Sequence, residues 1–235
     1  MNRKFVFISN RVSPVLPALA EEFPNDFASF VLVARASNSQ LNVDSAVSCL
    51  APVGIPLFVL TEQYLKSVLF LSFLQLLDLD FIVVHSLHFL LPRQVLEAPR
   101  CCCLNLHPSL LPAYRGPNPW FWQYYDEQKT SGFTVHKMTS QEDAGDIILQ
   151  QEFPMDYTMM QFIFSEKMLK EVGAPLLCSA IRNYDDITPI HQTNPQQYRR
   201  ARNIVDYQND PDIKKMTSHQ IDIIRSVYPD FPINK

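Results

Sequence analysis

Glycine is the residue this chain most lacks: it fills only 5 of 235 positions and none of the first 50. Ordinary proteins contain about 7% glycine. The Rossmann G-x-G-x-x-G fingerprint and the Walker P-loop both need several glycines after an early strand, because the backbone there approaches a phosphate closely. The sequence therefore excludes both loops, and with them the common routes to binding NAD or ATP.

An excess of positive charge and a metal-type cysteine spacing are also missing. The formal net charge is −4, from 20 basic and 24 acidic residues, whereas nucleic-acid binders usually carry a basic face. Three of the five cysteines are consecutive, at positions 101–103, and there is no C-x-x-C. We therefore expect a reducing, cytoplasmic chain with buried thiols, and neither a nucleic-acid partner nor a metal or redox site.

The chain has no evident membrane segment. The apolar run at residues 5–8 is too short for a signal-peptide core. Residues 68–91 are apolar enough to suggest a span, but Asp78 and Asp80 lie near the middle. A charge at the bilayer centre costs roughly 2.5–3.5 kcal/mol on insertion scales. Two buried elements joined by a turn are the better interpretation.

Short apolar runs alternate with helical segments through the first half of the chain, which indicates β-α-β units and a parallel sheet. Strands that are buried on both faces have such continuous apolar runs. The expected strands are 4–8, 30–33, 56–60, 81–84 and 101–106, and the expected helices are 14–22, 44–50 and 61–77.

The pattern changes after residue 107. Residues 132–138 and 147–155 alternate apolar and polar side chains, which predicts an antiparallel edge to the sheet. Further helices are expected at 120–128, 162–181 and 217–227. The fold class is thus α/β: a Rossmann-like open twisted sheet, mostly parallel with an antiparallel edge, plus a short C-terminal extension. We predict a catalytic domain at 1–185 and the extension at 186–235, joined near 183–195.

Residues 105–116 follow an expected strand and read Asn-Leu-His-Pro-Ser-Leu-Leu-Pro-Ala-Tyr-Arg-Gly. Ligands of open α/β sheets bind at the carboxyl ends of strands. Asn105 and His107 are two residues apart, so their side chains face the same way on a strand. An amide donor and an imidazole can stabilise and protonate a developing oxyanion. On this pair alone, a capped strand end with a hydrogen-bonded core histidine is the simpler interpretation.

A second segment adds a carboxylate. Residues 132–138 read Gly-Phe-Thr-Val-His-Lys-Met, and residues 141–148 read Gln-Glu-Asp-Ala-Gly-Asp-Ile-Ile. Asp143 therefore lies in a small-residue turn between two expected strands. A carboxylate near an imidazole favours the imidazolium. The alternative is that residues 143–145 are simply a turn.

Together these segments resemble the folate-dependent formyltransferases, which include the glycinamide ribonucleotide, methionyl-tRNA and amino-sugar formyltransferases. The separation of Asn105 and Asp143, 143 − 105 = 38 residues, fits that family. The resemblance implies formyl transfer from 10-formyltetrahydrofolate to a primary amine, with no metal. Asn105 would donate a hydrogen bond to the oxyanion, protonated His107 would supply charge and a proton, and Asp143 would keep His107 protonated and oriented.

The resemblance also implies binding residues. Folate would contact two loops, namely His88, Phe89, Leu90, Leu91 and Thr139, Ser140, Gln141, Glu142, although residues 89–91 alone would be interpreted as core. The acceptor would contact Arg11, Ser13, Ser109, Tyr114 and Arg115.

The loop at residues 9–14 decides between acceptors. In glycinamide ribonucleotide formyltransferase the corresponding loop is glycine-rich and cradles a phosphate, whereas here it has no glycine. The tRNA enzyme carries an additional C-terminal domain, which a chain ending at residue 235 with negative charge does not suggest. Residues 223–229 are similar to the connector that follows the catalytic domain in the tRNA and amino-sugar enzymes. The expected acceptor is therefore a nucleotide-linked amino sugar.

Other interpretations remain open. Glycinamide ribonucleotide is the second choice of acceptor. A 10-formyltetrahydrofolate hydrolase would use the same donor, but that family usually carries a regulatory N-terminal domain, and this chain begins directly at its first strand. A catalytically silent binding module would not need the trio. Apolar surface in residues 186–235 is compatible with a homodimer.

Overall fold

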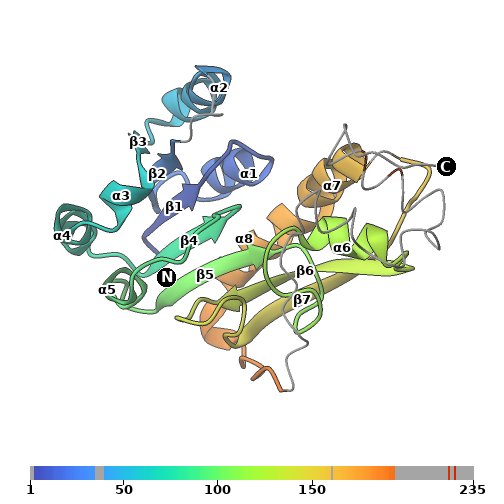
Figure 1. The fold of residues 1–235 in the computed structure, drawn as a ribbon. Helices are drawn as coiled ribbons and strands as arrows, with labels where there is room; N and C mark the ends of the chain where they lie inside the picture. Colours follow the sequence, from blue (N-terminus) through green and yellow to red (C-terminus); the bar gives the residue numbers. More distant parts are fainter. Residues whose placement is uncertain (1–2, 35–39, 160, 194–221, 223–224, 226–235) are drawn as a thin grey trace.

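The computed structural model describes residues 3–34, 40–159 and 161–193, together with Asp222 and Arg225. A single sheet has the order β3-β2-β1-β4-β5-β6-β7 (Figure 1). Its first five strands are parallel, and β6 is antiparallel to both of its neighbours, β5 and β7. This confirms the expected fold class. The strands are β1 (Phe5–Ser9), β2 (Phe27–Val33), β3 (Leu57–Leu60), β4 (Phe81–His85), β5 (Cys102–His107), β6 (Thr130–Lys137) and β7 (Ile147–Pro154).

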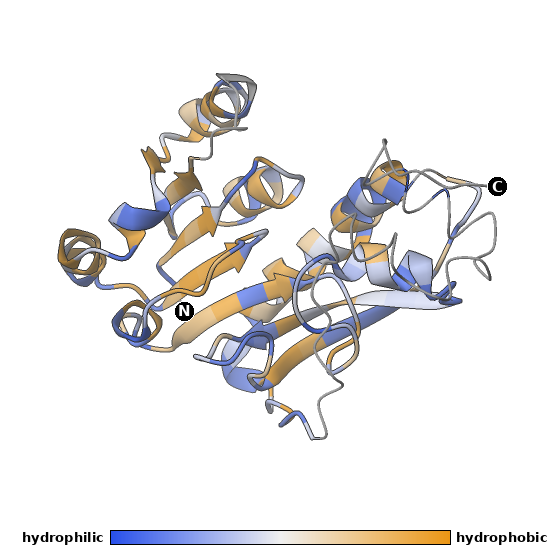
Figure 2. Ribbon diagram, in the orientation of Figure 1, coloured by the Kyte–Doolittle hydropathy of each residue, from blue (hydrophilic) through white to orange (hydrophobic). Residues whose placement is uncertain are grey.

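Helices cover both faces of the sheet and form two hydrophobic cores (Figure 1). The larger core lies under α1 (Val15–Glu22), α2 (Gln40–Leu50), α6 (Pro119–Tyr125), α7 (Gln161–Met168) and α8 (Ala174–Arg182). The smaller core lies under α3 (Glu62–Leu65), α4 (Val68–Leu77) and α5 (Arg93–Leu96). The central strands β1 and β4 are buried along their whole length, as their continuous apolar runs predicted (Figure 2).

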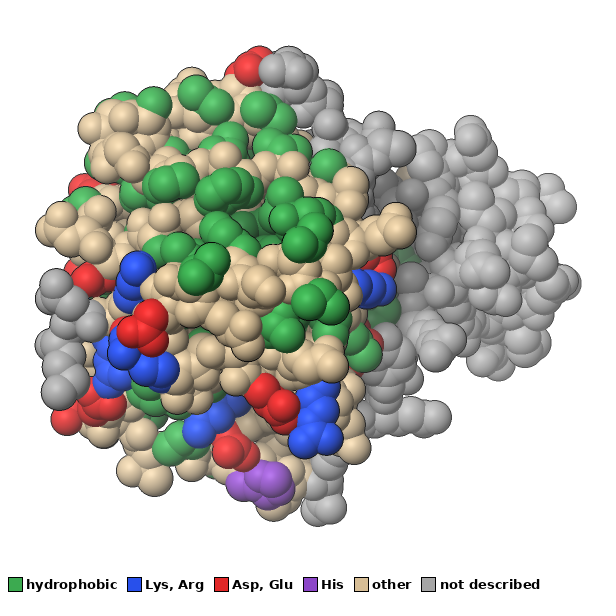
Figure 3. All heavy atoms as spheres, turned by 90° about the vertical axis from the view of Figure 1, so that its left-hand side faces the viewer, with side chains coloured by type: hydrophobic (Ala, Val, Ile, Leu, Met, Phe, Trp, Pro, Cys, Tyr) green, Lys and Arg blue, Asp and Glu red, His purple; other side chains and the backbone are tan. Residues whose placement is uncertain are grey.

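The helix expected at residues 61–77 is two helices, α3 and α4. Thr61 and Ser67 each take an extended conformation and cap the helix that follows; the Ser67 hydroxyl accepts a hydrogen bond from the Phe70 N–H at 3.3 Å. The expectation that this apolar stretch is buried is wrong for the outer face of α4, where Leu76 is 86% exposed. Figure 3 shows that hydrophobic side chains gather on this side of the molecule. Within the described residues, no helix is long and apolar enough to cross a bilayer.

The helix expected at 162–181 exists but is interrupted. A π-helical turn, Leu169–Gly173, joins α7 to α8. Pro175 lies in the first turn of α8 and has no N–H to donate, so the hydrogen-bond register changes at this point. The helix expected at 217–227 lies outside the described residues. The thiols of Cys103 and Cys178 are buried, as expected, but that of Cys101 is exposed.

The described chain stays attached to the sheet beyond residue 185. Ile190 exchanges two backbone hydrogen bonds with Ile147 of β7, each of 2.8 Å. Gln192 donates side-chain hydrogen bonds to the carbonyl oxygens of Asp143 (3.0 Å) and Gly145 (2.6 Å). Residues 186–193 therefore support the Asp143 turn, while the division into a domain at 1–185 and an extension at 186–235 stays a prediction.

Candidate active site

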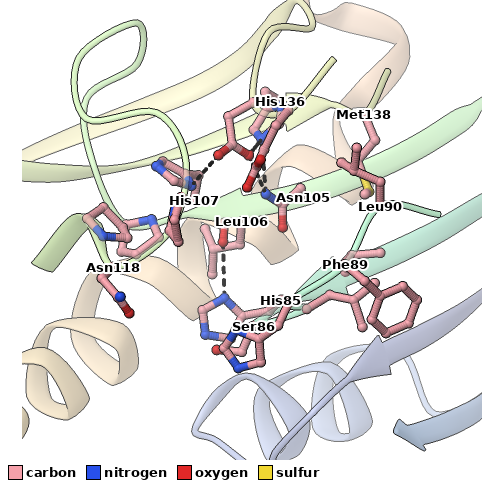
Figure 4. Close-up of a pocket in the computed structure, with 18 of the residues that line it drawn as sticks. His85, Ser86, Phe89, Leu90, Asn105, Leu106, His107, Asn118, His136 and Met138 are labelled. Carbon is pink, nitrogen blue, oxygen red and sulfur yellow. Dashed lines mark hydrogen bonds and ion pairs between the residues drawn. The ribbon is translucent and has the colours of Figure 1, made fainter. Parts of the chain in front are cut away.

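A cavity of about 590 Å³ opens at the carboxyl ends of β4 and β5 (Figure 4). This is the edge at which open α/β sheets bind ligands, and the volume suits a small-molecule site. One side of the cavity is formed by Phe89, Leu90 and Met138, which we name the Phe89 side. Asn118 lies across the cavity from them (Figure 4), and we name this side, with the neighbouring lining residues 117–121, the Trp120 side. Asn105, His107 and Asp143 line the cavity between them.

Antiparallel pairing places Asn105 directly opposite His136 in the sheet. The Asn105 amide nitrogen lies 3.0 Å from His136 Nε2 and donates to Asp143 Oδ1 at 3.3 Å. His136 Nδ1 lies 2.9 Å from the Lys137 carbonyl, so a neutral ring carries its proton on Nδ1 and accepts from Asn105 at Nε2; Nε2 also lies 3.4 Å from Asp143 Oδ1. His136 was not predicted to be a site residue, although its position opposite Asn105 follows once β5 and β6 are paired.

Asp143 is fixed by groups from several loops. Its Oδ2 accepts a hydrogen bond from the Gly116 N–H at 2.8 Å and lies 3.4 Å from His107 Nδ1. Burial raises the pKa of the Asp143 carboxyl, but His107, His136 and the Gly116 N–H together outweigh burial and hold it well below its usual value. Asp143 is therefore a permanent anion at neutral pH.

His107 lies between two acceptors, which are Asp143 Oδ2 and the Tyr114 carbonyl oxygen, 2.9 Å from its Nε2. A neutral ring turns one lone pair toward an acceptor, whereas the imidazolium satisfies both contacts. Burial nevertheless lowers the pKa of His107 by more than Asp143 raises it. Burial and Asp143 therefore act in opposite directions on the pKa of His107, and the role of Asp143 in keeping the ring protonated stays a prediction.

The two expected folate loops reach the cavity only in part. His88, Phe89 and Leu90 line it, as do Thr139, Gln141 and Glu142. Leu91 instead packs in the smaller core, 4% exposed, and Ser140 is exposed and not among the lining residues.

None of the five expected acceptor residues is among the lining residues. Ser109 is fully buried and donates its hydroxyl to the Ala113 carbonyl at 2.7 Å. Arg115 holds the Glu142 carbonyl, and Tyr114 donates its hydroxyl to Asp126 at 2.9 Å. Arg11 forms an ion pair of 2.6 Å with Glu166. Ser13 is 5% exposed at the start of α1. Their assigned roles stay predictions, and in this structure Ser109, Tyr114 and Arg115 shape the loop around Asp143 and His107.

A family comparison fits this geometry. The family model described as "Formyl transferase" matches residues 52–174, which is more than half of the chain and includes the whole of the Asn105, His107 and Asp143 cluster. The chain belongs to the formyl transferase family. Among its described residues, no group of three histidine, cysteine, aspartate or glutamate side chains is placed to hold a metal ion.

Methionyl-tRNA formyltransferases are among the curated relatives of this chain. The protein of Syntrophus aciditrophicus is 37% identical over 141 residues, 59% of this chain and 44% of the relative. That of Ehrlichia ruminantium is 31% identical over 173 residues, 74% of this chain and 56% of the relative. The chain thus spans about half the length of the curated relatives it matches.

Solved structures share the fold. Glycinamide ribonucleotide transformylase 1 from Symbiobacterium toebii superimposes with a TM-score of 0.68 at 20% identity, over 80% of this chain and 94% of that one. HypX from Aquifex aeolicus, solved in complex with tetrahydrofolic acid, gives 0.65 at 16% identity, over 99% of this chain and 35% of that one. At these identities the likeness concerns the fold.

Proposed function

We propose that this chain transfers the formyl group of 10-formyltetrahydrofolate to a primary amine of a small molecule. The observation that carries the proposal is the convergence of Asn105, His107 and Asp143 at one cavity, although Asp143 lies on a turn 38 residues beyond Asn105 (143 − 105). Membership of the formyl transferase family supports the same chemistry.

Asn105 supplies the oxyanion contact in this mechanism. When an amine attacks the formyl carbon, negative charge develops on the formyl oxygen, and a positioned N–H stabilises it. Both N–H groups of the Asn105 amide already have acceptors, of which Asp143 Oδ1 is the more distant at 3.3 Å. The formyl oxygen would replace Asp143 as one acceptor, while His136 Nε2 keeps hold of the other N–H.

His107 supplies the proton transfer. Its lowered pKa makes the ring neutral and able to take up a proton as the amine adds. The resulting imidazolium has an acceptor on each nitrogen, Asp143 on one side and the Tyr114 carbonyl on the other. Asp143 therefore stabilises a charge that forms during the reaction, and the ring then returns the proton to the leaving nitrogen.

The Phe89 side of the cavity fits the folate donor. Its apolar side chains, Phe89, Leu90 and Met138, offer a wall for a flat aromatic ring. Backbone groups of the flanking loops can read the polar edge of that ring. The donor supplies the formyl group, and the chain supplies its orientation toward Asn105.

For the acceptor we propose a nucleotide-linked amino sugar. The loop after β1 has no glycine to cradle a phosphate, and Arg11 is already neutralised by Glu166. Glycinamide ribonucleotide is the alternative that this loop disfavours, and hydrolysis of the donor is the alternative in which water replaces the amine. The names of the curated relatives favour a second candidate, a methionyl-tRNA, although a formal net charge of −4 does not favour a nucleic-acid partner.

A panel of acceptors tests the proposal. Purified protein would be incubated with 10-formyltetrahydrofolate and, separately, a UDP-linked amino sugar, glycinamide ribonucleotide, methionyl-tRNA or buffer, and tetrahydrofolate and formylated product would be measured. Formylation of the sugar at the highest kcat/KM supports the proposal. Faster formylation of another acceptor corrects the substrate, tetrahydrofolate formed without any acceptor assigns a hydrolase, and no tetrahydrofolate in any tube contradicts the proposed chemistry.

A further inference from the structure

His85 ends β4 beneath the catalytic strand and has no place in the mechanism above. Its side chain is 4% exposed, yet it is among the residues that line the cavity. Its Nδ1 lies 3.0 Å from the Leu106 carbonyl oxygen. In Figure 4 the ring lies below Leu106, between Asn118 on one side and Phe89 on the other.

The Leu106 carbonyl is a critical point of attachment. Leu106 separates the two residues of the motif, Asn105 and His107. The parallel pairing of β4 with β5 ends at Val84 and Asn105, so His85 extends the attachment of β5 by one side-chain hydrogen bond. Rotation of this peptide would turn both neighbouring side chains away from their partners, because residues on either side share its dihedral angles.

The second ring nitrogen is buried without a partner. The Leu106 carbonyl can only accept, so His85 Nδ1 carries the proton and Nε2 presents a lone pair. Among the described residues no donor reaches Nε2. Burial and the nearby charge of Arg11 lower the pKa of His85 to about 4, so the ring stays neutral at physiological pH. A buried acceptor without a donor destabilises the fold, which favours a use for it in function.

The ring faces the Trp120 side of the cavity. Side chains alternate along a strand, and Val84 packs in the smaller core with Phe89 and Met138. His85 therefore projects to the opposite face, where Leu106 and Phe121 belong to the larger core. The donor is assigned to the Phe89 side, so Nε2 is directed to the half of the cavity that remains for the acceptor.

We propose that His85 positions the catalytic strand through Nδ1 and binds the acceptor through Nε2, which accepts a hydrogen bond from an N–H or O–H group of that substrate. The role of Nε2 in binding the acceptor rests on the proposed function, whereas the role of Nδ1 does not. It makes the acceptor a molecule with an uncharged hydrogen-bond donor close to its reacting amine, as an amino sugar has.

Two substitutions separate the two nitrogens. In His85→Asn the amide N–H can stand where Nδ1–H stands, but nothing replaces Nε2. We expect kcat to fall by less than about threefold while KM for the acceptor rises about tenfold, the value of one hydrogen bond. In His85→Leu both contacts are lost, and kcat should fall about tenfold or more as well. Leu76→Asn, at an 86% exposed position of α4 that does not line the cavity, is the control.

The kinetic assay would use the acceptor that the wild type formylates fastest in the panel above. An unchanged acceptor KM in His85→Asn would refute the substrate contact, and an unchanged kcat in His85→Leu would refute the positioning role. If no acceptor is formylated, the proposed function fails separately, and NMR still tests the positioning. The side-chain amide resonances of Asn105 should move in His85→Leu and stay in His85→Asn; equal shifts in both variants would contradict it.

Discussion

The ends of β5 and β1 lie at the same edge of the sheet but hold their polar groups in different ways. At the end of β5, Asn105 and His107 face a cavity and contact a carboxylate from a distant turn. At the end of β1, Arg11 is paired with Glu166 at 2.6 Å and donates to Ser86 at 3.4 Å, and it does not line the cavity. The polar side chains at the end of β5 line the cavity, whereas Arg11 at the end of β1 is paired within the protein.

This difference separates the two halves of the proposed reaction. The chemistry of transfer depends on the β5 end, which lies inside the matched family region at residues 52–174. The β1 end lies outside that region, and the loop there would have to change with the acceptor. Changes at the β5 end should therefore affect kcat, while changes at the β1 end should affect only which acceptor binds.

The largest effect is expected for the amide and imidazole of the β5 end. Removing an oxyanion donor typically lowers the rate by ~10²–10³-fold. We expect Asn105→Ala and His107→Ala each to lower kcat by at least that factor, with circular dichroism and folate-analogue affinity little changed. Near-normal turnover by either variant, measured as tetrahydrofolate release, would contradict the mechanism.

The next largest effect is expected for a substitution at a glycine beside the site, Gly145. A Cβ added to Gly145 would stand 2.0 Å from the Lys137 carbonyl oxygen, the same oxygen that accepts from His136 Nδ1. We expect Gly145→Ala to destabilise the fold by about 1–3 kcal/mol, or about 2–4 °C in Tm per kcal/mol, and to lower kcat by disturbing His136.

Gly54→Ala provides the matched control for this effect. A Cβ at Gly54 would meet no atom within 4 Å, although its φ of +70° disfavours alanine. Calorimetry should therefore show a loss of stability in both variants. Turnover assays should show a loss of kcat only in Gly145→Ala. A fall in kcat for Gly54→Ala would show that turnover reports general stability.

The sequence predicted the elements that periodicity and motif spacing determine. The parallel strands fall in this class, since their continuous apolar runs and their alternation with helices define them, whereas the grouping of Asn105, His107 and Asp143 was implied by the resemblance to the formyltransferases. The break between α3 and α4 was missed because it depends on a serine cap inside an apolar run. The directions of side chains in loops were also missed. The Ser109 hydroxyl donates a hydrogen bond to the Ala113 carbonyl within the loop, and only the folded loop shows this contact. His136 needed the register of β5 against β6.

The pH dependence of turnover should show how the charge of the Asp143 carboxylate affects the pKa of the His107 imidazole. Asp143 raises the pKa of His107, though by less than burial lowers it. Asp143→Asn removes that charge, so the pKa of His107 should fall further below its ordinary value of 6.5, and activity that needs the neutral ring should persist to lower pH on the acidic side. A ¹⁵N titration of His107 in both proteins measures this shift, and an unmoved value would remove the electrostatic role of Asp143.

The smallest effect is expected at the β1 end, where the ion pair keeps Arg11 from an anionic ligand. Glu166→Gln keeps the shape of the side chain and removes the charge that neutralises Arg11, whose side chain is 33% exposed. Arginine binds phosphate through charge-assisted hydrogen bonds, so inorganic phosphate should raise the Tm of Glu166→Gln and bind it about tenfold more tightly than it binds the wild type.

Glu171→Gln removes one exposed charge from the same helical segment and serves as the control for net charge. If phosphate stabilises both variants equally, the gain reflects overall charge and not the release of Arg11. If phosphate already stabilises the wild type and Arg11→Ala abolishes the effect, then Arg11 can bind phosphate despite its pairing with Glu166. The contrast between the two strand ends would then weaken, and the pairing of Arg11 with Glu166 would no longer count against glycinamide ribonucleotide as the acceptor.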